Sequence, residues 1–579
     1  MKQPNPAIVA QDAVRRLPRL ALWLFCIAYV LPGFFGREPW KSADMTAFGY
    51  MAELARGDSP WLSPQLMGLP VQGDALMPYW LGAWAIMATS WGLPADFSVR
   101  LLHALMLGLT LVATWYAVYY LARSPQAQPV AFAFGGEAEP ADYARAMADG
   151  GLLASIACLG LAQLGHETTP ASAQLLFTAL SFYAFAALHY AVWMPAVCAV
   201  VGIVGLTLSG APAVAMMLLA GAWLIRLLDR SGGPPRGKTF AAHAAPGRSD
   251  VAAWGLALLA AATVWLAIRL DLWQWRIAPP NADWADFRGM ARLLLWFTWP
   301  AWPLTLWTLW RWRWQLIQMV KGNMSRHLAL PLLFVVVTVG NTLTSSAGDR
   351  ALLASLPALA TLAAFALPTL QRGVASLIDW FTLVFFTGCA FVIWVVWIAM
   401  QTGLPPQPAA NVARLVPGFQ PSFSWLALLL ATGATLAWAW LVKWRVGRHR
   451  AAIWKSMVLP AGGAALCWLL LMTLWLPLLN FARSYTAMTS QIRAVIGTPP
   501  CVETFGLDRG QIAAFQFHAG LRLQPTSSAA SCPWLLVDRD KVASLPGAVQ
   551  MRQWTPQYFG YRPTDRDDDV LLFRRVATR

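Results

Sequence analysis

Residues 379–400 read DWFTLVFFTGCAFVIWVVWIAM, an apolar run of 22 residues in which Asp379 is the one charged residue. As an α-helix this run is about 33 Å long, enough to cross a hydrocarbon core of roughly 30 Å while satisfying its own backbone hydrogen bonds. The run therefore predicts a transmembrane helix. Similar apolar runs occur at 20–35, 99–121, 151–164, 170–191, 193–208, 211–228, 251–270, 291–310, 328–342, 351–368, 423–442 and 457–479.

Composition places the whole chain in the same class. Of its 579 residues, 58% are hydrophobic and only 12% are Asp, Glu, Lys or Arg, about half the share in soluble domains. A net charge of +16 would suggest nucleic-acid binding in a soluble protein, but here Lys and Arg gather in short loops between apolar runs. We therefore predict an all-α polytopic membrane protein with about 13 transmembrane helices, surrounded by membrane lipids and without a nucleic-acid partner.

Basic residues predict the orientation of the helices. Lys2, Arg15, Arg16 and Arg19 precede the first apolar run, so the N-terminus is expected in the cytoplasm. The other basic clusters lie in loops that an alternating map also places inside, and an odd number of spans leaves the C-terminal tail outside. No small-residue cleavage site follows the first run, so we expect it to be retained. This pattern predicts a multi-pass protein of a bacterial inner membrane with a periplasmic tail.

The map divides the chain into a cytoplasmic N-terminus at 1–19, a transmembrane domain at 20–480 and a periplasmic domain at 481–579. Residues 37–97 are too polar to span the membrane and are expected to form the first periplasmic loop. Short helical patterns in it, such as Ala43–Arg56, predict juxtamembrane helices.

The tail after residue 480 combines strand and helix patterns. A helical pattern near Gly510–His518 lies among strand-like runs, which predicts a small α/β domain. Five of the seven cysteines lie in apolar runs, and only Cys501 and Cys532 lie in the tail. In an oxidising compartment this pair is expected to form a disulfide. The strand-like runs are Cys501–Phe505, Leu521–Leu523, Trp534–Asp538 and Val570–Phe573.

The first loop carries most of the polar residues in an unusual order. It begins with REPWKSAD at 37–44, and GDSPWLSP follows at 57–64. This loop resembles the first-loop pattern of membrane glycosyltransferases with a C-type fold, among them the aminoarabinose transferases and protein O-mannosyltransferases. Other residues of the matching pattern are Tyr50, Met51-Ala52-Glu53-Leu54, Gly68-Leu69-Pro70, Tyr79-Trp80-Leu81 and Arg100-Leu101.

The resemblance implies an inverting glycosyltransferase that moves a sugar from a polyprenyl-phosphate donor to a cell-envelope acceptor, which could be lipid A, a glycan or a protein. In that family an acidic residue after the first helix is catalytic, and the matching position is Asp44. A carboxylate there would deprotonate an acceptor hydroxyl, or position an acceptor that is already ionised. The alternative for Asp44 is a helix N-cap, since a helical pattern follows it.

A second polar turn, GHETTP at 165–170, separates two apolar runs on the outer side. It resembles the loop that holds the family's second acidic position. We expect His166 and Glu167 to face the first loop, where they could bind a metal, orient the acceptor or assist proton transfer. The alternative is a Glu that only caps a helix.

The leaving group is a phosphate, and its developing charge calls for cations. Candidates on the outer side are Arg37, Lys41, Arg276 and Arg350. Arg350 resembles part of the family's late outer loop, although the tyrosine of that loop is absent here. For each of these cations, an anchor at the membrane interface is the alternative role.

Two departures from the family pattern bear on a metal. Many relatives have Asp-Glu where this chain has Asp44-Met45, and aminoarabinose transferases carry Glu-Lys at Gly73-Asp74. Asp74 could restore a metal-ligating carboxylate, or this protein could use no divalent metal or a different donor. A nucleotide cofactor is not expected, because the sequence has no Walker A motif and no GxGxxG after a strand.

Two other classes of protein fit many helices with polar outer loops. A transporter or flippase commonly shows internal repeats or broken helices at the bilayer midplane, and we find no repeat in this sequence. A non-catalytic envelope assembly protein would keep the fold without needing Asp44 or Glu167. Neither the sugar nor the acceptor can be read from the sequence.

Overall fold

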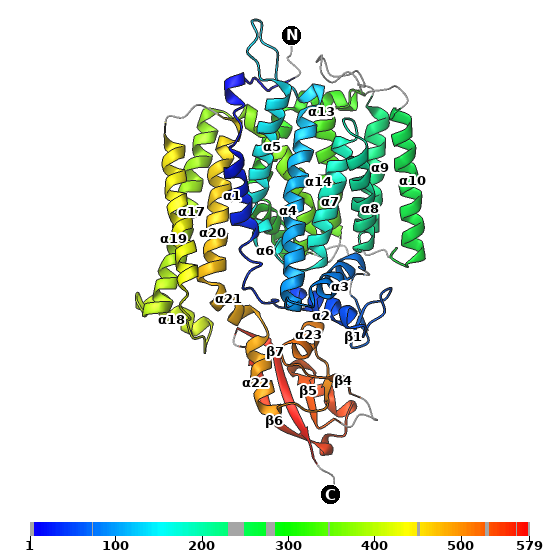
Figure 1. The fold of residues 1–579 in the computed structure, drawn as a ribbon, viewed down its shortest axis with the longest axis vertical. Coiled ribbons are helices and arrows are strands. Elements are labelled where there is room, and N and C mark those ends of the chain that lie inside the picture. Colours follow the sequence, from blue (N-terminus) through cyan, green and yellow to red (C-terminus); the bar gives the residue numbers. More distant parts are fainter. Residues whose placement is uncertain are drawn as a thin grey trace.

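The computed structural model describes residues 5–576 apart from 72, 74, 230–247, 274–283, 345–347, 448–451, 527–531 and 563. A bundle of long helices makes up most of the molecule, and a small domain with a sheet lies beyond one end of it (Figure 1). We call this end of the bundle the outer end and the opposite end, near the N-terminus, the inner end.

Among the described residues, seven helical segments are long and apolar enough to cross a membrane, and four shorter apolar helices accompany them. Together they coincide with 11 of the predicted runs, which confirms the fold class of a polytopic, mainly helical protein. The number of spans stays a prediction. The long segments are α4 (Ala95–Ala122), α7 (Pro170–Ala187), α14 (Arg326–Thr344), α15 to η4 (Gly348–Thr369), α17 (Arg372–Thr402), α19 (Trp425–Val446) and η5 with α20 (Ile453–Leu474), and the shorter helices are α1 (Arg19–Val30), α8 (Trp193–Leu208), α9 (Pro212–Leu228) and α10 (Arg248–Arg269).

The two other predicted runs are each divided between two helices. Residues 151–164 belong to α5 (Pro140–Ala157) and α6 (Leu159–Leu164), and residues 291–310 to α11 (Trp284–Phe297) and α12 (Ala301–Arg311). Pro300 lies at the second break. Proline has no backbone N–H, so a continuous helix would lose a hydrogen bond there.

Residues 122–149 lie between two of the predicted apolar runs, and helix α5 begins in their second half. The charged residues there have partners in the fold. Asp142 pairs with Arg16 at 3.0 Å, and Asp149 accepts a hydrogen bond of 2.9 Å from the Trp115 indole. The charges therefore fit a helix that packs against α4 and the N-terminal segment.

The first outer loop folds as predicted, with helices at the membrane surface. Helix α2 (Ala43–Arg56) matches the predicted helical pattern, and a short hairpin of β1 (Gln65–Leu66) and β2 (Leu69–Pro70) leads to α3 (Met77–Thr89). Gly49 allows α2 to approach the C-terminal domain closely, since a Cβ there would lie 2.5 Å from that of Ala513. The loop and the C-terminal domain thus share one apolar core.

The C-terminal domain is a small α/β unit, as the tail predicts. Helices α21 (Leu476–Arg483) and α22 (Thr486–Ile496) lead from the bundle into a five-stranded sheet of order β4-β3-β5-β7-β6. Strands β4, β3 and β5 are parallel, and β7 and β6 complete the sheet in antiparallel fashion. The remaining elements are β3 (Val502–Phe505), α23 (Arg509–Phe517), β4 (Leu523–Pro525), β5 (Trp534–Asp538), β6 (Trp554–Arg562) and β7 (Asp565–Arg575).

Strand β6 was not predicted, because Pro556 and Gly560 interrupt its strand pattern. It lies at the edge of the sheet, and its register with β7 shifts beside both residues. Edge strands tolerate such irregularities because no further strand pairs with their free edge, so a missing N–H there costs no hydrogen bond.

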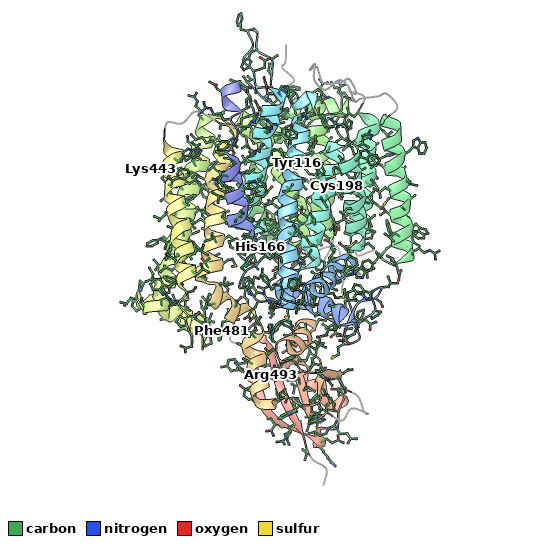
Figure 2. The ribbon with its side chains drawn as sticks, in the orientation of Figure 1. Tyr116, His166, Cys198, Lys443, Phe481 and Arg493 are labelled. Atoms are coloured by element: carbon green, nitrogen blue, oxygen red, sulfur yellow. A yellow bond between two sulfur atoms is a disulfide. The ribbon has the colours of Figure 1, made fainter. Side chains whose placement is uncertain are left out.

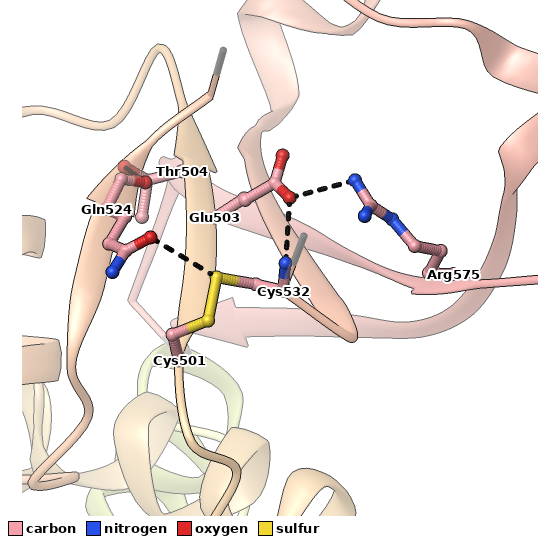
Figure 3. Close-up of a disulfide and its surroundings, with 6 residues drawn as sticks. All are labelled: Cys501, Glu503, Thr504, Gln524, Cys532 and Arg575. Atoms are coloured by element: carbon pink, nitrogen blue, oxygen red, sulfur yellow. Dashed lines mark hydrogen bonds and ion pairs between the residues drawn. A yellow bond between two sulfur atoms is a disulfide. The ribbon is translucent and has the colours of Figure 1, made fainter. Parts of the chain in front are cut away.

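The predicted disulfide is present in the structure. Cys501 and Cys532 are joined with a Cα–Cα distance of 5.3 Å, which ties the start of β3 to the segment before β5 (Figure 3). The Cys532 backbone N–H donates to Glu503, whose carboxylate also pairs with Arg575 at 3.0 Å. The bond closes a loop inside the domain.

Candidate active site

Asp44 lies in the first turn of α2, buried at 3% exposure between the first outer loop and the turn before α7. Four donors surround its carboxylate. Oδ1 accepts hydrogen bonds from the Thr168 backbone N–H, at 2.7 Å, and from the Thr168 hydroxyl. Oδ2 accepts from Arg37 Nη2 at 2.7 Å and from the Trp40 N–H at 3.2 Å. The predicted N-cap alternative is wrong, because Ser42 occupies the N-cap position of α2.

Arg37 neutralises Asp44 in the interior of the site. Its side chain is 1% exposed, it also donates to the His166 backbone carbonyl at 2.7 Å, and its guanidinium lies 4.1 Å from the centre of the Trp40 ring. An isolated carboxylate buried to this degree would be strongly destabilising, and Arg37 supplies the opposite charge that offsets this cost. Arg37, predicted as a phosphate ligand, instead holds the candidate catalytic carboxylate.

Glu167 forms a second buried carboxylate–arginine pair. Its Oε2 accepts a hydrogen bond of 2.9 Å from Arg350 Nε, and its side chain is 5% exposed against 33% for Arg350. Burial raises the pKa of Glu167, the charge of Asp44 adds to this rise, and Arg350 opposes it. Asp44 and Glu167 therefore lie in one electrostatic environment. The helix-cap alternative is wrong, because Thr169 is the N-cap residue of α7.

His166 does not face the first loop as expected. Figure 2 shows it among the helices of the bundle, where its ring lies 4.6 Å from Trp468 and 4.9 Å from Phe34. Its two ring nitrogens contact the backbone carbonyls of Ala162 and Tyr29. Burial lowers the pKa of His166 to about 3, and the neutral imidazole donates to only one of these two carbonyls at a time. Its packing against apolar rings, not its charge, positions the turn that carries Glu167.

Lys41 connects the first loop to the C-terminal domain. Its ammonium group lies 2.5 Å from Asp565 and 2.8 Å from Asp568, both on β7. Burial disfavours the charged form, but the two hydrogen bonds outweigh this effect and raise the pKa of Lys41. Lys41, which was predicted to bind the donor phosphate, is thus already paired with two carboxylates. These ion pairs hold the C-terminal domain against the first loop.

Arg483 is a cation beside the site that sequence reasoning missed. It is exposed at the end of α21, and its guanidinium lies 5.3 Å from the centre of the same Trp40 ring that Arg37 covers. Within the part of the chain that the structure describes, Arg483 makes no ion pair. Although the side chain reaches solvent, its partial removal from water and the charge of Arg37 lower the pKa of Arg483, and Glu167 opposes that shift. Arg483 is therefore within the field of both groups. Its position shortly after the last apolar run, on the outer side, is the sequence feature that could have identified Arg483 as a candidate cation.

Two predicted residues, Arg276 and Asp74, lie outside the described residues. Among the residues that the structure does describe, no three His, Cys, Asp or Glu side chains come together as a metal cluster. Hydrogen bonds occupy both oxygens of Asp44, and Glu167 is paired with Arg350. These carboxylates do not fit a metal ion in their present arrangement.

No protein-family model matches this chain, and no curated protein matches it. Among solved structures, two of one protein have a similar fold over nearly the whole chain. One similar structure is ArnT from Cupriavidus metallidurans bound to undecaprenyl phosphate, with 13% identity, a TM-score of 0.58, and 97% of this chain and 99% of that chain covered. The apo state of the same protein has 14% identity, a TM-score of 0.56, and coverage of 96% and 97%.

The match extends over the bundle, the first outer loop and the C-terminal domain, because nearly the whole of both chains is covered. This confirms, for the fold, the resemblance that the first loop indicates. The chain is a multi-pass membrane protein with an ArnT-like fold.

Proposed function

We propose that this protein is a membrane glycosyltransferase that transfers a sugar from a polyprenyl-phosphate donor to a cell-envelope acceptor. The observation that carries the proposal is the pair of buried carboxylates, Asp44 and Glu167, each held by an arginine at the outer end of an ArnT-like bundle. Paired carboxylates of this kind are costly to keep in a membrane protein and mark functional sites.

Asp44 is the proposed base. The acceptor hydroxyl oxygen attacks the anomeric carbon, the bond from that carbon to the phosphate oxygen breaks, the polyprenyl phosphate leaves, and the hydroxyl proton passes to Asp44. A single displacement of this kind inverts the configuration of the anomeric carbon. Since four donors occupy Asp44, the Thr168 hydroxyl must rotate away or relay the proton. If the acceptor is an ionised phosphate, Asp44 positions it instead.

Arg350 and Arg483 are the proposed ligands of the donor phosphate. Arg350 keeps a third of its side chain exposed while it pairs with Glu167, and Arg483 has no carboxylate partner among the described residues. Guanidinium groups stabilise the charge that develops on a departing phosphate.

This assignment predicts that Arg483→Gln raises the KM for the lipid-phosphate donor about tenfold and leaves the KM for the acceptor unchanged. Steady-state kinetics of the purified protein measure this. Arg414→Gln, an exposed arginine on α18 (Pro406–Leu415), is the control. Equal donor KM values for the two variants would argue that Arg483 is only an interface anchor.

The proposed orientation has the outer end in the periplasm and the N-terminus in the cytoplasm of a bacterial inner membrane. The acceptor is an envelope glycolipid such as lipid A, a glycan or a protein. The first loop and the C-terminal domain meet beside Asp44, on the side of the bundle where this orientation puts the acceptor.

The experiment compares envelope glycolipids, glycans and glycoproteins by mass spectrometry in a deletion strain. The strain is complemented with wild type, Asp44→Asn or Asp58→Asn, at equal protein levels. Asp58 lies in the same loop but is exposed and pairs with Arg56 at the surface, which makes it a matched control. We expect one sugar mass to disappear in the deletion and Asp44→Asn strains and to return with wild type and Asp58→Asn.

Full complementation by Asp44→Asn would refute the enzyme proposal. It would favour the two alternatives, a transporter or flippase and a non-catalytic assembly protein, neither of which needs a base at this position.

A further inference from the structure

The inner end of the bundle holds a pocket far from Asp44. Its cavity volume is about 20 Å³, and it lies between the inner ends of α4, α7, α9, α10 and α14. Its walls are mostly apolar, with Leu188, Leu256 and Leu330 among them. Two arginines, Arg226 of α9 and Arg326 of α14, also line it. A pocket that combines apolar walls with two cations selects for an amphipathic anion.

The two arginines have more hydrogen-bonding capacity than the described residues around them use. Arg326 is 8% exposed and its Nε pairs with Asp229 at 3.1 Å, but its Nη1 is buried without a partner. The Nε of Arg226 is also buried without a partner among the described residues. His189, the other titratable group lining the pocket, lies 3.7 Å from the same Asp229 carboxylate.

Topology alone does not account for this arrangement. Positive-inside bias and the C-terminal ends of α4, α7 and α9 both favour arginine at the inner end, but such arginines normally extend into water. A buried guanidinium N–H without an acceptor is costly, and a bound anion would remove that cost. The ring of Tyr190, 5.7 Å from the Arg326 guanidinium, restricts its movement.

We propose that this pocket binds a phosphate group, with Arg226 and Arg326 as its ligands, and that the phosphate belongs to the headgroup of an anionic phospholipid. Basic pockets between transmembrane helices on the inner side bind such headgroups, and the apolar walls would contact the glycerol and the first methylenes. Free inorganic phosphate offers the same anion chemistry without the apolar part. The proposal is independent of the proposed glycosyltransferase activity.

The test uses the full-length protein, purified in a neutral detergent and delipidated. Its thermal unfolding is followed with added phosphatidylglycerol, phosphatidylcholine or inorganic phosphate, and bound lipid is counted by native mass spectrometry. The variants are Arg226→Gln and Arg326→Lys, and Arg313→Gln is the control. Arg313 is a half-buried arginine of the inner end that rests on Trp310 and does not line the pocket. Arg226→Gln is the decisive variant because Arg226 has no ion pair among the described residues.

We expect phosphatidylglycerol to raise Tm and to be retained, phosphatidylcholine to do neither, and Arg226→Gln to weaken binding about fivefold. Stabilisation by inorganic phosphate that depends on Arg226 would support the phosphate site but assign it to a soluble ion. Equal binding of phosphatidylglycerol by wild type, Arg226→Gln and Arg313→Gln, with no effect of phosphate, would overturn the proposal.

Discussion

One carboxylate oxygen of Asp44 accepts hydrogen bonds from both the backbone N–H and the hydroxyl of Thr168. The Thr168 N–H is fixed by the turn before α7, whereas its hydroxyl can rotate. Thr168→Val removes the hydroxyl and keeps the amide contact and most of the volume. We expect an activity loss of about 100-fold with the fold intact if the hydroxyl relays the proton to Asp44, and a much smaller loss if it only rotates away. Thr168→Ser, which keeps the hydroxyl, should retain activity within about threefold. The two variants need to be compared by turnover of the donor and by Tm. Equal losses in both variants would indicate a packing role.

Glu167 predicts a pH dependence of stability. Burial raises its pKa in the folded protein, so between the unfolded and folded pKa values the folded state binds more protons than the unfolded state. Its contribution therefore makes the protein more stable as pH falls through this interval, and less stable as pH rises through the folded-state pKa. Burial also raises the pKa of Glu53, Glu503 and Asp508, so the effect of Glu167 has to be read from the difference between wild type and variant.

Glu167→Gln lacks this contribution. On going from pH 7.5 to pH 5, the Tm of the variant should therefore fall by about 1–3 °C relative to the Tm of wild type. Thermal unfolding in buffers of equal ionic strength measures this difference, and Glu38→Gln serves as a control on the same loop. A variant with the pH profile of wild type would mean that Glu167 titrates normally.

At the scale of elements, the disulfide and the Lys41 pairs act on the same domain. The disulfide joins residues separated by 31 positions, so its loss in Cys501→Ser/Cys532→Ser should lower the stability of the C-terminal domain by about 3–4 kcal/mol. The helical bundle should unfold at an unchanged temperature, because the bond lies wholly within the domain. Limited proteolysis followed by mass spectrometry distinguishes the two parts. Simultaneous destabilisation of the bundle would show that the domain is required to hold the first loop, for which Lys41 and α2 provide the contact.

At the scale of the molecule, the orientation in the membrane can be tested directly. Alkaline phosphatase fused after residue 579 should be active in cells, and a fluorescent protein fused there should be dark, because both reporters depend on the side of the membrane. A fusion truncated within residues 230–247 should give the opposite result. Active phosphatase at both positions would contradict the odd number of spans on which the orientation rests.

The sequence by itself determined the membrane class, the first-loop helix at Ala43–Arg56 and the cysteine pair, because hydrophobic length, helical periodicity and position in a polar tail are local properties. It also selected Asp44 and Glu167, which the fold brings into one electrostatic environment. Only the tertiary structure decided what each charge contacts. Arg37 and Lys41 look alike in the sequence, yet one neutralises Asp44 and the other docks on β7, more than 500 residues away. Arg483 lies more than 400 residues from Trp40 in the chain and contacts its ring in space. Charge pairing depends on distances between segments that no local pattern contains, and burial then sets the strength of each pair.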